Sequence, residues 1–273
     1  MITIVTDSSS YFKKAEARDL GVRVIPINYS VNGHNYSESF SDQNGDFESL
    51  LKVNGKFTTT HPSIFAFLGC FEEELSKNNQ VLCITISSHL SGTYNAAYSA
   101  AKQINSDGIA VLDSHFAAGG LYLLIKEARK FARDGLSLVE IVQKLLIARD
   151  KIIMAFSVDD ITPLRNSGRI RFVRMSMGTI LNIKPILICS DGAVVSDGIA
   201  RGSTEIIKKL TAKINADAQE VVISYIGDNR LAANLYHVVR GSLPLTTITL
   251  QKVGPILGIH LGLRAVAISI ISS

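Results

Sequence analysis

The sequence predicts an α/β fold in two parts: an N-terminal α/β domain on a parallel sheet, residues 1–158, and a C-terminal α+β domain with a mixed or antiparallel sheet, residues 159–273. In the first part, apolar runs bounded by turn residues alternate with helical stretches, which is typical of a parallel sheet covered on both faces. In the second part, Asp191 and Gly192 stand between two apolar runs, and this dipeptide is a strong hairpin signal. Pro163 and an arginine-rich segment interrupt the rhythm between the two parts.

The N-terminal part carries five apolar runs and four stretches with helical periodicity. We expect strands at residues 2–5, 22–27, 81–86, 110–112 and 152–158, and helices at residues 64–75, 96–104, 120–131 and 138–147. Ser63 follows Pro62 and is the expected N-cap of the first of these helices. Residues 32–54 are polar and contain glycine, so we expect a long surface excursion there.

The C-terminal part continues with a hairpin that joins residues 186–189 to residues 193–196. Beyond it we expect helices at residues 204–214 and 231–240, and strands at residues 221–226, 246–251 and 265–270. Parallel sheets bind ligands beyond the carboxyl ends of their strands. Three such ends in the N-terminal part carry hydroxyls, at residues 6–10, at residues 87–91 and at Ser114.

The composition favours an interior built from aliphatic side chains. Of the 273 residues, 47% are hydrophobic but only 7% are aromatic and none is Trp, and such a core also suits an apolar ligand cavity. The net charge of +4 comes from scattered basic residues, which are densest at Arg165, Arg169, Arg171 and Arg174. Nucleic-acid binding needs a stronger basic stripe with interleaved aromatics, so we expect no nucleic-acid partner.

Three observations bear on the cellular compartment. No apolar run approaches the roughly 20 residues that span a bilayer, so we expect no transmembrane segment. Met1 leads directly into an apolar run, without a charged leader or a cleavage site. Cys70, Cys83 and Cys189 are far apart and in apolar surroundings, which is typical of free thiols in a reducing compartment. We therefore expect a soluble cytoplasmic protein without structural zinc.

Several catalytic and cofactor motifs are absent from the sequence. There is no GxxxxGK[ST], no GxGxxG after the first strand, no GxSxG and no HExxH. None of the six histidines is paired at i, i+4, a spacing that places two metal ligands on one helix face. These absences argue against P-loop enzymes, dinucleotide oxidoreductases, serine hydrolases and zinc hydrolases, and we expect no metal and no cofactor.

The most informative stretch is residues 84–95, which read ITISSHLSGTYN. An apolar run of strand type ends in hydroxyls and a glycine, and a helical stretch follows at once. Such a loop offers hydroxyls and the free N–H groups of a helix start to an anion. It has neither the Lys of a phosphate loop nor a base beside its serines, so we expect it to hold a polar head group without cleaving it.

Six segments form a series along the chain. They are TTTHPS at residues 58–63, SSHLSGTY at 87–94, VLDS at 111–114, LRNSGRI at 164–170, LNIKPIL at 181–187 and GPILGIHLG at 254–262. In this order they resemble the DegV family of fatty-acid-binding proteins, which includes the fatty-acid carriers of bacterial fatty acid kinase. The resemblance covers nearly the whole chain and implies a two-domain DegV-like fold, with one long-chain fatty acid as ligand in an apolar tunnel between the domains.

The resemblance also implies which residues hold the carboxylate. Hydroxyls of the first two segments would hold it beside a histidine, and on this chain these are Thr59 or Thr60, Ser91 and His260. Each has an alternative role, because the threonines could cap the following helix, Ser91 could be an N-cap alone and His260 could be a structural histidine. The hydroxyls would fix the head group, while each buried CH₂ of the acyl chain contributes about 0.8 kcal/mol.

Two arginines and two acids complete the candidates. In the kinase carriers, the resemblance implies that Arg169 and Arg201 contact the partner kinase or the phosphoryl group, and the alternative is that both are solvated surface charges. Asp7 and Asp113 follow predicted strands, and we expect them to organise loops by accepting backbone N–H bonds.

The chain departs from the family pattern near the expected site. His61 stands where the family has glutamine, and Phe116, Ala118 and Tyr122 stand where it has small hydroxyl residues or glycine. Arg264 replaces the last glycine of the histidine segment. We expect Phe116 and Tyr122 to narrow or reroute the tunnel and so to change the preferred acyl chain.

The sequence leaves three functions open. The leading one is a non-catalytic carrier that binds a long-chain fatty acid and presents its carboxylate to a separate ATP-dependent kinase for acyl-phosphate formation. The alternative is an enzyme subunit of the dihydroxyacetone-kinase type, in which His260 or His61 would hold a small ketone covalently. The third is a regulator in which the lipid only fills the structure.

Overall fold

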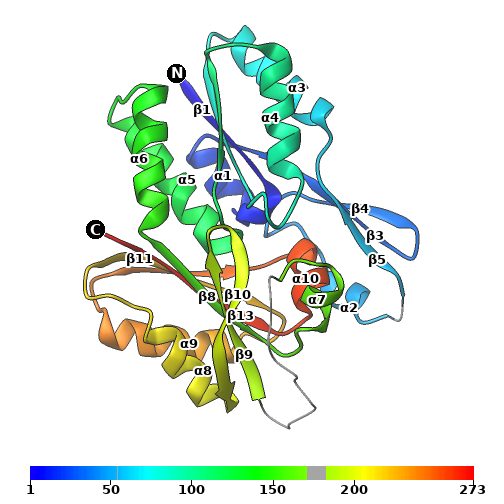
Figure 1. Cartoon of the computed structure of the whole chain (residues 1–273), viewed down its shortest axis with the longest axis vertical. Coiled ribbons are helices and arrows are strands. Elements are labelled where there is room, and N and C mark those ends of the chain that lie inside the picture. The colour runs from blue at the N-terminus through cyan, green and yellow to red at the C-terminus, as the bar shows by residue number, and fades with distance from the viewer. Residues whose placement is uncertain (54, 171–182) are drawn as a thin grey trace.

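A computed structural model describes residues 1–53, 55–170 and 183–273 of the chain. It has two main sheets, one above the other in Figure 1, and a small third sheet at the side. Arg171 and Arg174 of the basic group, and the first two residues of the LNIKPIL segment, lie outside the described residues. Among the helices of the described ranges, none is long and apolar enough to cross a membrane.

The first sheet has four parallel strands, which confirms the predicted N-terminal architecture. Their order is β2 (Val22–Ile25), β1 (Ile2–Asp7), β6 (Gln80–Thr85) and β7 (Ile109–Asp113). Val5 and Cys83 face helices α3 (Ile64–Ser76) and α4 (Thr93–Ile104), whereas Ile4 and Leu82 face α5 (Ala118–Arg133). Helices α1 (Lys14–Asp19) and α6 (Leu138–Asp150) pack beside β2 and α5. Alternate residues of each strand are therefore buried on opposite faces.

The second sheet has six strands and is mixed. Their order is β10 (Ala193–Arg201), β9 (Ile183–Ser190), β8 (Ile152–Val158), β13 (Ala265–Ser272), β11 (Ala218–Ile226) and β12 (Thr247–Lys252). Only β11 and β12 pair in parallel among these neighbours. Helices α8 (Gly202–Thr211) and α9 (Arg230–Ser242) cover one face, and α5 packs on the other, between the two sheets.

Strand β8 belongs to the second sheet and not, as predicted, to the parallel sheet of the N-terminal part. It lies within residues 1–158, but it pairs with β13 and β9 of the second sheet. The chain therefore passes from the first sheet to the second between α6 and β8. The division into domains at residue 158 remains a prediction.

The β9–β10 hairpin turns as the sequence predicts. Asp191 and Gly192 have φ angles of 47° and 79°, the left-handed pair that a two-residue type I′ turn requires. The turn lies against the loop that follows β6, where the Ser87 hydroxyl donates a hydrogen bond to the Gly192 carbonyl at 2.6 Å. The hairpin of the second sheet is thereby fixed to the first sheet.

In the stretch of residues 32–54, expected to be a long surface excursion, the described residues are mostly exposed but contain regular structure. Strand β4 (His34–Glu38) and helix α2 (Phe47–Leu51) lie in this stretch. Strand β4 pairs with β3 (Ile27–Val31), which pairs with β5 (Phe57–Thr60), to form the third sheet. Asn32 and Gly33, with φ of 52° and 84°, form the hairpin turn. Strand β4 is exposed except at Glu38, so its sequence lacks the apolar alternation by which strands are predicted.

Three short helices complete the fold: η1 (Ser8–Ser10), α7 (Thr162–Asn166) and α10 (Pro255–Leu261). Helix α10 packs on the third sheet, where Ile256 joins the small apolar cluster of β3. Ser63 is the predicted N-cap of α3, since its hydroxyl accepts a hydrogen bond from the Ala66 N–H at 3.3 Å.

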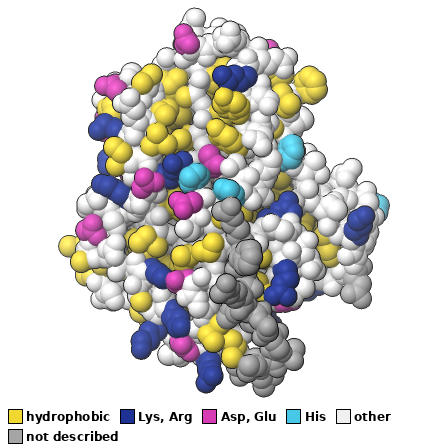
Figure 2. All heavy atoms as spheres, viewed as in Figure 1, with side chains coloured by type: hydrophobic (Ala, Val, Ile, Leu, Met, Phe, Trp, Pro, Cys, Tyr) yellow, Lys and Arg dark blue, Asp and Glu magenta, His cyan; other side chains and the backbone are white. Residues whose placement is uncertain are grey.

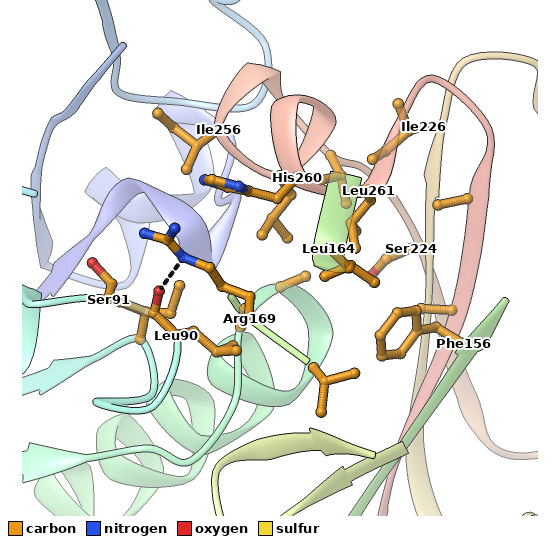
Figure 3. A pocket seen from close by; sticks show the side chains of 18 of the residues that line it. Leu90, Ser91, Phe156, Leu164, Arg169, Ser224, Ile226, Ile256, His260 and Leu261 are labelled. Atoms are coloured by element: carbon orange, nitrogen blue, oxygen red, sulfur yellow. Dashed lines mark hydrogen bonds between the residues drawn. The ribbon is translucent and has the colours of Figure 1, made fainter. Parts of the chain in front are cut away.

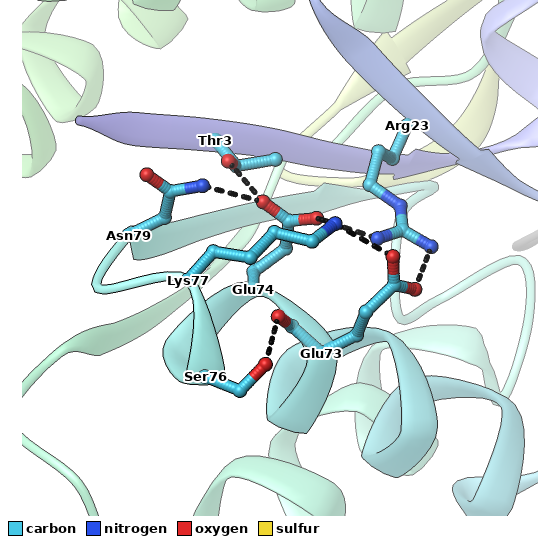
Figure 4. Close-up of polar contacts among 7 residues, drawn as sticks. All are labelled: Thr3, Arg23, Glu73, Glu74, Ser76, Lys77 and Asn79. Atoms are coloured by element: carbon cyan, nitrogen blue, oxygen red, sulfur yellow. Dashed lines mark hydrogen bonds and ion pairs between the residues drawn. The ribbon is translucent and has the colours of Figure 1, made fainter.

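A buried carboxylate ties α3 to the first sheet (Figure 4). Glu74 accepts hydrogen bonds from the Thr3 hydroxyl at 2.7 Å and from the Asn79 amide at 2.9 Å, and it forms ion pairs with Arg23 and Lys77. Burial alone would raise the pKa of Glu74, but these donors outweigh it and lower the pKa to about 2. The ionised carboxylate is therefore part of the folded structure.

On the face shown in Figure 2, basic and acidic side chains are interspersed.

Candidate head-group and acyl-chain site

A cavity of about 120 Å³ lies between the second sheet, α10, the third sheet and the loops that follow β6 and β7 of the first sheet. Its walls are mainly apolar, and the side chains come from segments throughout the chain, including Phe156 on β8, Leu164 on α7, Ile226 on β11 and Ile256 on α10. In Figure 3, polar side chains gather at one end of the cavity, near Ser91, and Phe156 and Ile226 lie away from it. The arrangement of polar and apolar side chains in the cavity thus suits a ligand with a polar head and an apolar tail.

A threonine and a histidine meet at the polar end. Thr59 Oγ1 and His260 Nε2 lie 2.9 Å apart, within hydrogen-bond distance. Strand β5 positions the threonine and α10 positions the histidine. Burial, together with the positive charge of Arg169, lowers the pKa of His260 to about 4. His260 is therefore neutral near pH 7 and acts there as a hydrogen-bonding group.

Ser91 lies in the loop after β6 and lines the same end of the cavity. Its hydroxyl is 2.9 Å from the Thr93 hydroxyl and 3.4 Å from the Thr93 backbone nitrogen. The His61 ring packs so closely over Gly92 that a Cβ at that position would overlap it. Ser91 therefore contacts the start of α4 and borders the cavity, but it is not the N-cap, because Gly92 occupies that position.

Arg169 also belongs to the polar end, although the sequence suggests a surface role. The Arg169 Nε–H donates a hydrogen bond to the Leu90 carbonyl at 3.2 Å, and its guanidinium also bonds the Ser167 carbonyl. Figure 3 shows the guanidinium between Ser91 and His260. Within the described ranges, no carboxylate forms an ion pair with it, so its charge is available to an anion.

Two of the candidate residues lie away from the cavity. Thr60 is exposed on β5 and does not line the cavity, in contrast to its neighbour Thr59. Arg201 is exposed at the start of α8, where its backbone N–H donates to the Glu205 carboxylate at 2.7 Å. The fold therefore brings together Thr59, Ser91, His260 and Arg169 but leaves out Thr60 and Arg201.

The two acids organise loops, as predicted. Asp7 accepts hydrogen bonds from the Ile86 N–H at 2.7 Å and from the Ser9 N–H at 3.0 Å. Asp113 accepts from the His115 N–H at 3.0 Å and from the Ser88 N–H. These bonds fix the loops on which the polar end of the cavity depends.

The expectation that Phe116 and Tyr122 narrow the tunnel is wrong for the cavity described above. Neither side chain is among its lining residues, whereas Ala118 is. The Tyr122 ring packs 4.5 Å from the Phe12 ring centroid, and its hydroxyl donates to Glu16. Both aromatic residues belong to the core between the sheets.

Arg264, the further departure from the family pattern, is exposed and forms an ion pair with Asp159 at 3.6 Å.

The cavity walls could not be singled out from the sequence. Met154 and Phe156 on β8 and Ile226 on β11 read as ordinary buried strand residues, because apolar alternation is the same for a core and for a cavity wall. Ser224 breaks this pattern within an apolar run. It is buried in the cavity wall and donates to the Gln251 side chain at 2.9 Å.

Comparison with known proteins identifies the family. A model of the DegV family, a family described as uncharacterised, matches residues 1–273. The chain belongs to the DegV family. A DegV domain-containing protein of Halalkalibacterium halodurans is 29% identical over 275 residues, which cover 98% of this chain and 97% of that protein. A second DegV domain-containing protein, from Caldanaerobacter subterraneus, is 30% identical over 269 residues, which cover 96% of this chain and 95% of that protein.

Solved structures of DegV proteins share the fold. The structure of a DegV family protein from Thermus thermophilus, described as showing fatty acid binding, has a TM-score of 0.88 and 28% identity and covers 100% of this chain and 99% of that one. The Fatty Acid Kinase (Fak) B3 protein of Streptococcus pneumoniae, loaded with linoleic acid, has a TM-score of 0.85 and covers 100% of both chains. At 18% identity, this second likeness shows the fold alone.

Proposed function

We propose that this DegV protein binds one long-chain fatty acid, with the carboxylate at the polar end of the cavity and the acyl chain along the apolar walls. The observation that carries the proposal is the convergence of Thr59, Ser91, Arg169 and His260 on one end of a mainly apolar cavity. The fatty acid binding described for the Thermus thermophilus relative supports it.

The charge at the polar end suits a single carboxylate. The Arg169 guanidinium supplies one positive charge, whereas His260 is neutral near pH 7 because its pKa is about 4. The hydroxyls of Thr59 and Ser91 can donate hydrogen bonds to a carboxylate oxygen. Hydrogen bonds to a charged group contribute about 1.5–3 kcal/mol each, so a few of them fix the head group.

The acyl chain supplies most of the affinity in this proposal. Each buried CH₂ contributes about 0.8 kcal/mol, so a chain of fatty-acid length outweighs the head-group contacts. Residues of both predicted domains line the cavity, with Thr59 and Ser91 from residues 1–158 and Arg169 and His260 from residues 159–273. We therefore place the ligand between the two domains.

The dihydroxyacetone-kinase type of function gains no support from the site. A histidine that holds a small ketone covalently needs a compact polar pocket, whereas the cavity beside His260 and His61 is lined mainly by apolar side chains. His260 Nε2 already lies within hydrogen-bond distance of Thr59. A lipid uses the apolar walls, and a three-carbon ketone would leave most of them without a contact.

Titration of the delipidated protein tests the binding proposal. Calorimetry with palmitate is expected to give saturable binding at one site, and dihydroxyacetone is expected to give none. Arg169→Ala should weaken palmitate binding by about tenfold or more, since it removes the charged donor. Arg201→Ala, an arginine outside the cavity, is the matched control and should bind as the wild type does. Binding of the ketone alone would contradict the proposal.

A finer proposal is presentation of the bound fatty acid to a separate fatty acid kinase. The exposed Arg201 at the start of α8 is free of the cavity and available to a partner. The test is acyl-phosphate formation with the ATP-binding subunit of such a kinase. Arg201→Ala should lower the rate and leave the palmitate affinity unchanged. An unchanged rate of acyl-phosphate formation would show that Arg201 does not contribute to the interaction with the kinase.

A further inference from the structure

Helix α10 is held at both of its ends by the third sheet. Near its C-terminal end, His260 lies against Thr59 of β5. In its first turn, the Ile256 N–H donates a hydrogen bond at 3.0 Å to Oε2 of Glu38, the last residue of β4. The same small sheet therefore provides the hydroxyl beside His260 and the carboxyl group that caps its helix.

Glu38 is fully buried under the start of α10. Its second oxygen accepts a hydrogen bond from the Ser8 hydroxyl at 3.0 Å. Tyr11 lies beside it, and the Tyr11 hydroxyl accepts from the Leu257 N–H at 3.3 Å. A Cβ at Gly254 would overlap Glu38 Oε2, so only glycine lets the chain pass this closely before α10 begins. Two free N–H groups of the helix start are thus capped from the N-terminal half of the chain.

The surroundings of Glu38 are acidic or neutral. Asp7, Tyr11 and Tyr29 are titratable groups that interact electrostatically with Glu38, and no cation of the described ranges forms an ion pair with it. Burial raises the pKa of Glu38 to about 8, against the effect of the hydrogen bonds from Ile256 and Ser8. A carboxyl group placed without a cation in the interior costs stability. The hydrogen bond from the Ile256 N–H to Glu38 indicates that this buried carboxyl group serves to hold α10.

We propose that Glu38 is a positioning residue for the carboxylate site: by capping the first turn of α10, it fixes the helix so that His260 lies against Thr59. The proposal rests on the proposed function only for its effect on affinity. The position of the His260 ring can be measured without a ligand. Glu38 itself does not line the cavity and acts on the ligand through α10.

The test compares three substitutions at Glu38 with one elsewhere. Glu38→Ala removes the cap, and Glu38→Asp keeps the carboxyl group but shortens its reach. Glu38→Gln keeps an acceptor for the Ile256 N–H and a donor for the Ser8 hydroxyl. The matched control is Glu74→Gln. Glu74 is also a buried acid, but it lies on α3 and bonds residues of β1 and β2, away from α10 (Figure 4). Palmitate affinity and the His260 ring nitrogen shifts of the ligand-free protein are measured for each variant.

We expect Glu38→Ala and Glu38→Asp to weaken palmitate binding by about tenfold, the effect of one lost hydrogen bond. Both should shift the His260 nitrogen signals, whereas Glu38→Gln should restore both readouts to near the wild-type values. Glu74→Gln should leave both unchanged. The proposal is overturned if Glu38→Asp matches the wild type, if Glu38→Gln fails to restore the signals, or if Glu74→Gln shifts them equally. Should Glu38→Ala not fold, the Asp and Gln variants decide alone.

The two proposals fail in different ways. If the wild type does not bind palmitate, the proposed function is wrong, but the His260 signals of the ligand-free variants still judge the role of Glu38. If palmitate binds tightly and no substitution at Glu38 shifts the His260 signals, the fatty-acid proposal stands and the positioning role does not.

Discussion

Thr59 Oγ1 and His260 Nε2 are 2.9 Å apart, although 201 positions separate the two residues in the sequence. The contact joins β5 of the small third sheet to α10, and it lies at the polar end of an apolar cavity. Ser91 and Arg169 reach the same end from two further segments. The head-group site is therefore a product of the whole fold.

Removing the Thr59 hydroxyl should weaken fatty-acid binding. Thr59→Val keeps the size of the side chain but removes the hydrogen bond to His260 and to a bound carboxylate, so we expect an affinity loss of about five- to tenfold. Thr60→Val is the matched control, because Thr60 is exposed on the same strand. Calorimetry with palmitate measures both variants. Equal losses would mean that the strand, and not the Thr59 hydroxyl, determines the affinity.

His260 should make the stability of the protein depend on pH below neutrality. Its pKa is about 4 in the folded protein and about 6.5 in an unfolded chain. Between these values the unfolded state binds more protons, so the free energy of unfolding rises with pH from about 4 to 6.5 and this contribution is constant above. Urea unfolding should show that His260→Gln loses less stability than the wild type, by about 2 kcal/mol, between pH 7 and pH 5.

The control for this pH effect is His34→Gln, because His34 is exposed on β4. It should follow the wild-type curve at both pH values. A bound carboxylate favours the protonated imidazole, so loading with palmitate should also raise the pKa of His260. A wild type and a His260→Gln variant with parallel pH curves would contradict the assignment.

Glu74 should stabilise the fold only while it is ionised. Its folded-state pKa of about 2 is below the ordinary value of 4.5, so its contribution is complete above about pH 4.5 and is lost as the pH falls toward 2. Glu74→Gln should lower the free energy of unfolding at pH 7 by roughly 1–3 kcal/mol, with a smaller difference at pH 3. Glu73→Gln, at an exposed neighbour of Arg23, should have a much smaller effect. Chemical denaturation at the two pH values provides the comparison, and a loss that does not depend on pH would argue against the ionised state.

Ile226 should limit the length of the acyl chain. It lines the cavity and also a second cleft, of about 420 Å³, which Ile206 and Leu231 border on the far side of the second sheet. Ile226→Ala opens this partition, so the preference should shift from C16 toward C20 chains in a competition read by mass spectrometry. Ile223→Ala on the same strand is the control, since Ile223 is buried in the core under α8 and α9. An identical chain profile for the two variants would show that Ile226 does not set the limit.

The sequence predicts the parallel sheet and the β9–β10 hairpin because apolar period and turn chemistry are local signals. It does not predict β4, since that strand is exposed over most of its length and its only buried residue is Glu38, an acid. The Asn32–Gly33 pair is the local signal that could have revealed the hairpin.

The site is predicted less completely than the fold. The place of Arg169 depends on its bond to the carbonyl of Leu90, 79 positions away, and no local pattern encodes such a contact. The same holds for Phe116, which lies in the core beside the cavity instead of in its wall. Spacing within a motif places residues on an element, but long-range packing decides which of them meet.

Native mass spectrometry of the purified protein tests the central claim most directly. We predict one adduct per chain with the mass of a long-chain fatty acid, its loss on delipidation and its return when palmitate is added. A protein that carries no such adduct, and that takes up no fatty acid after delipidation while remaining folded, would contradict the account.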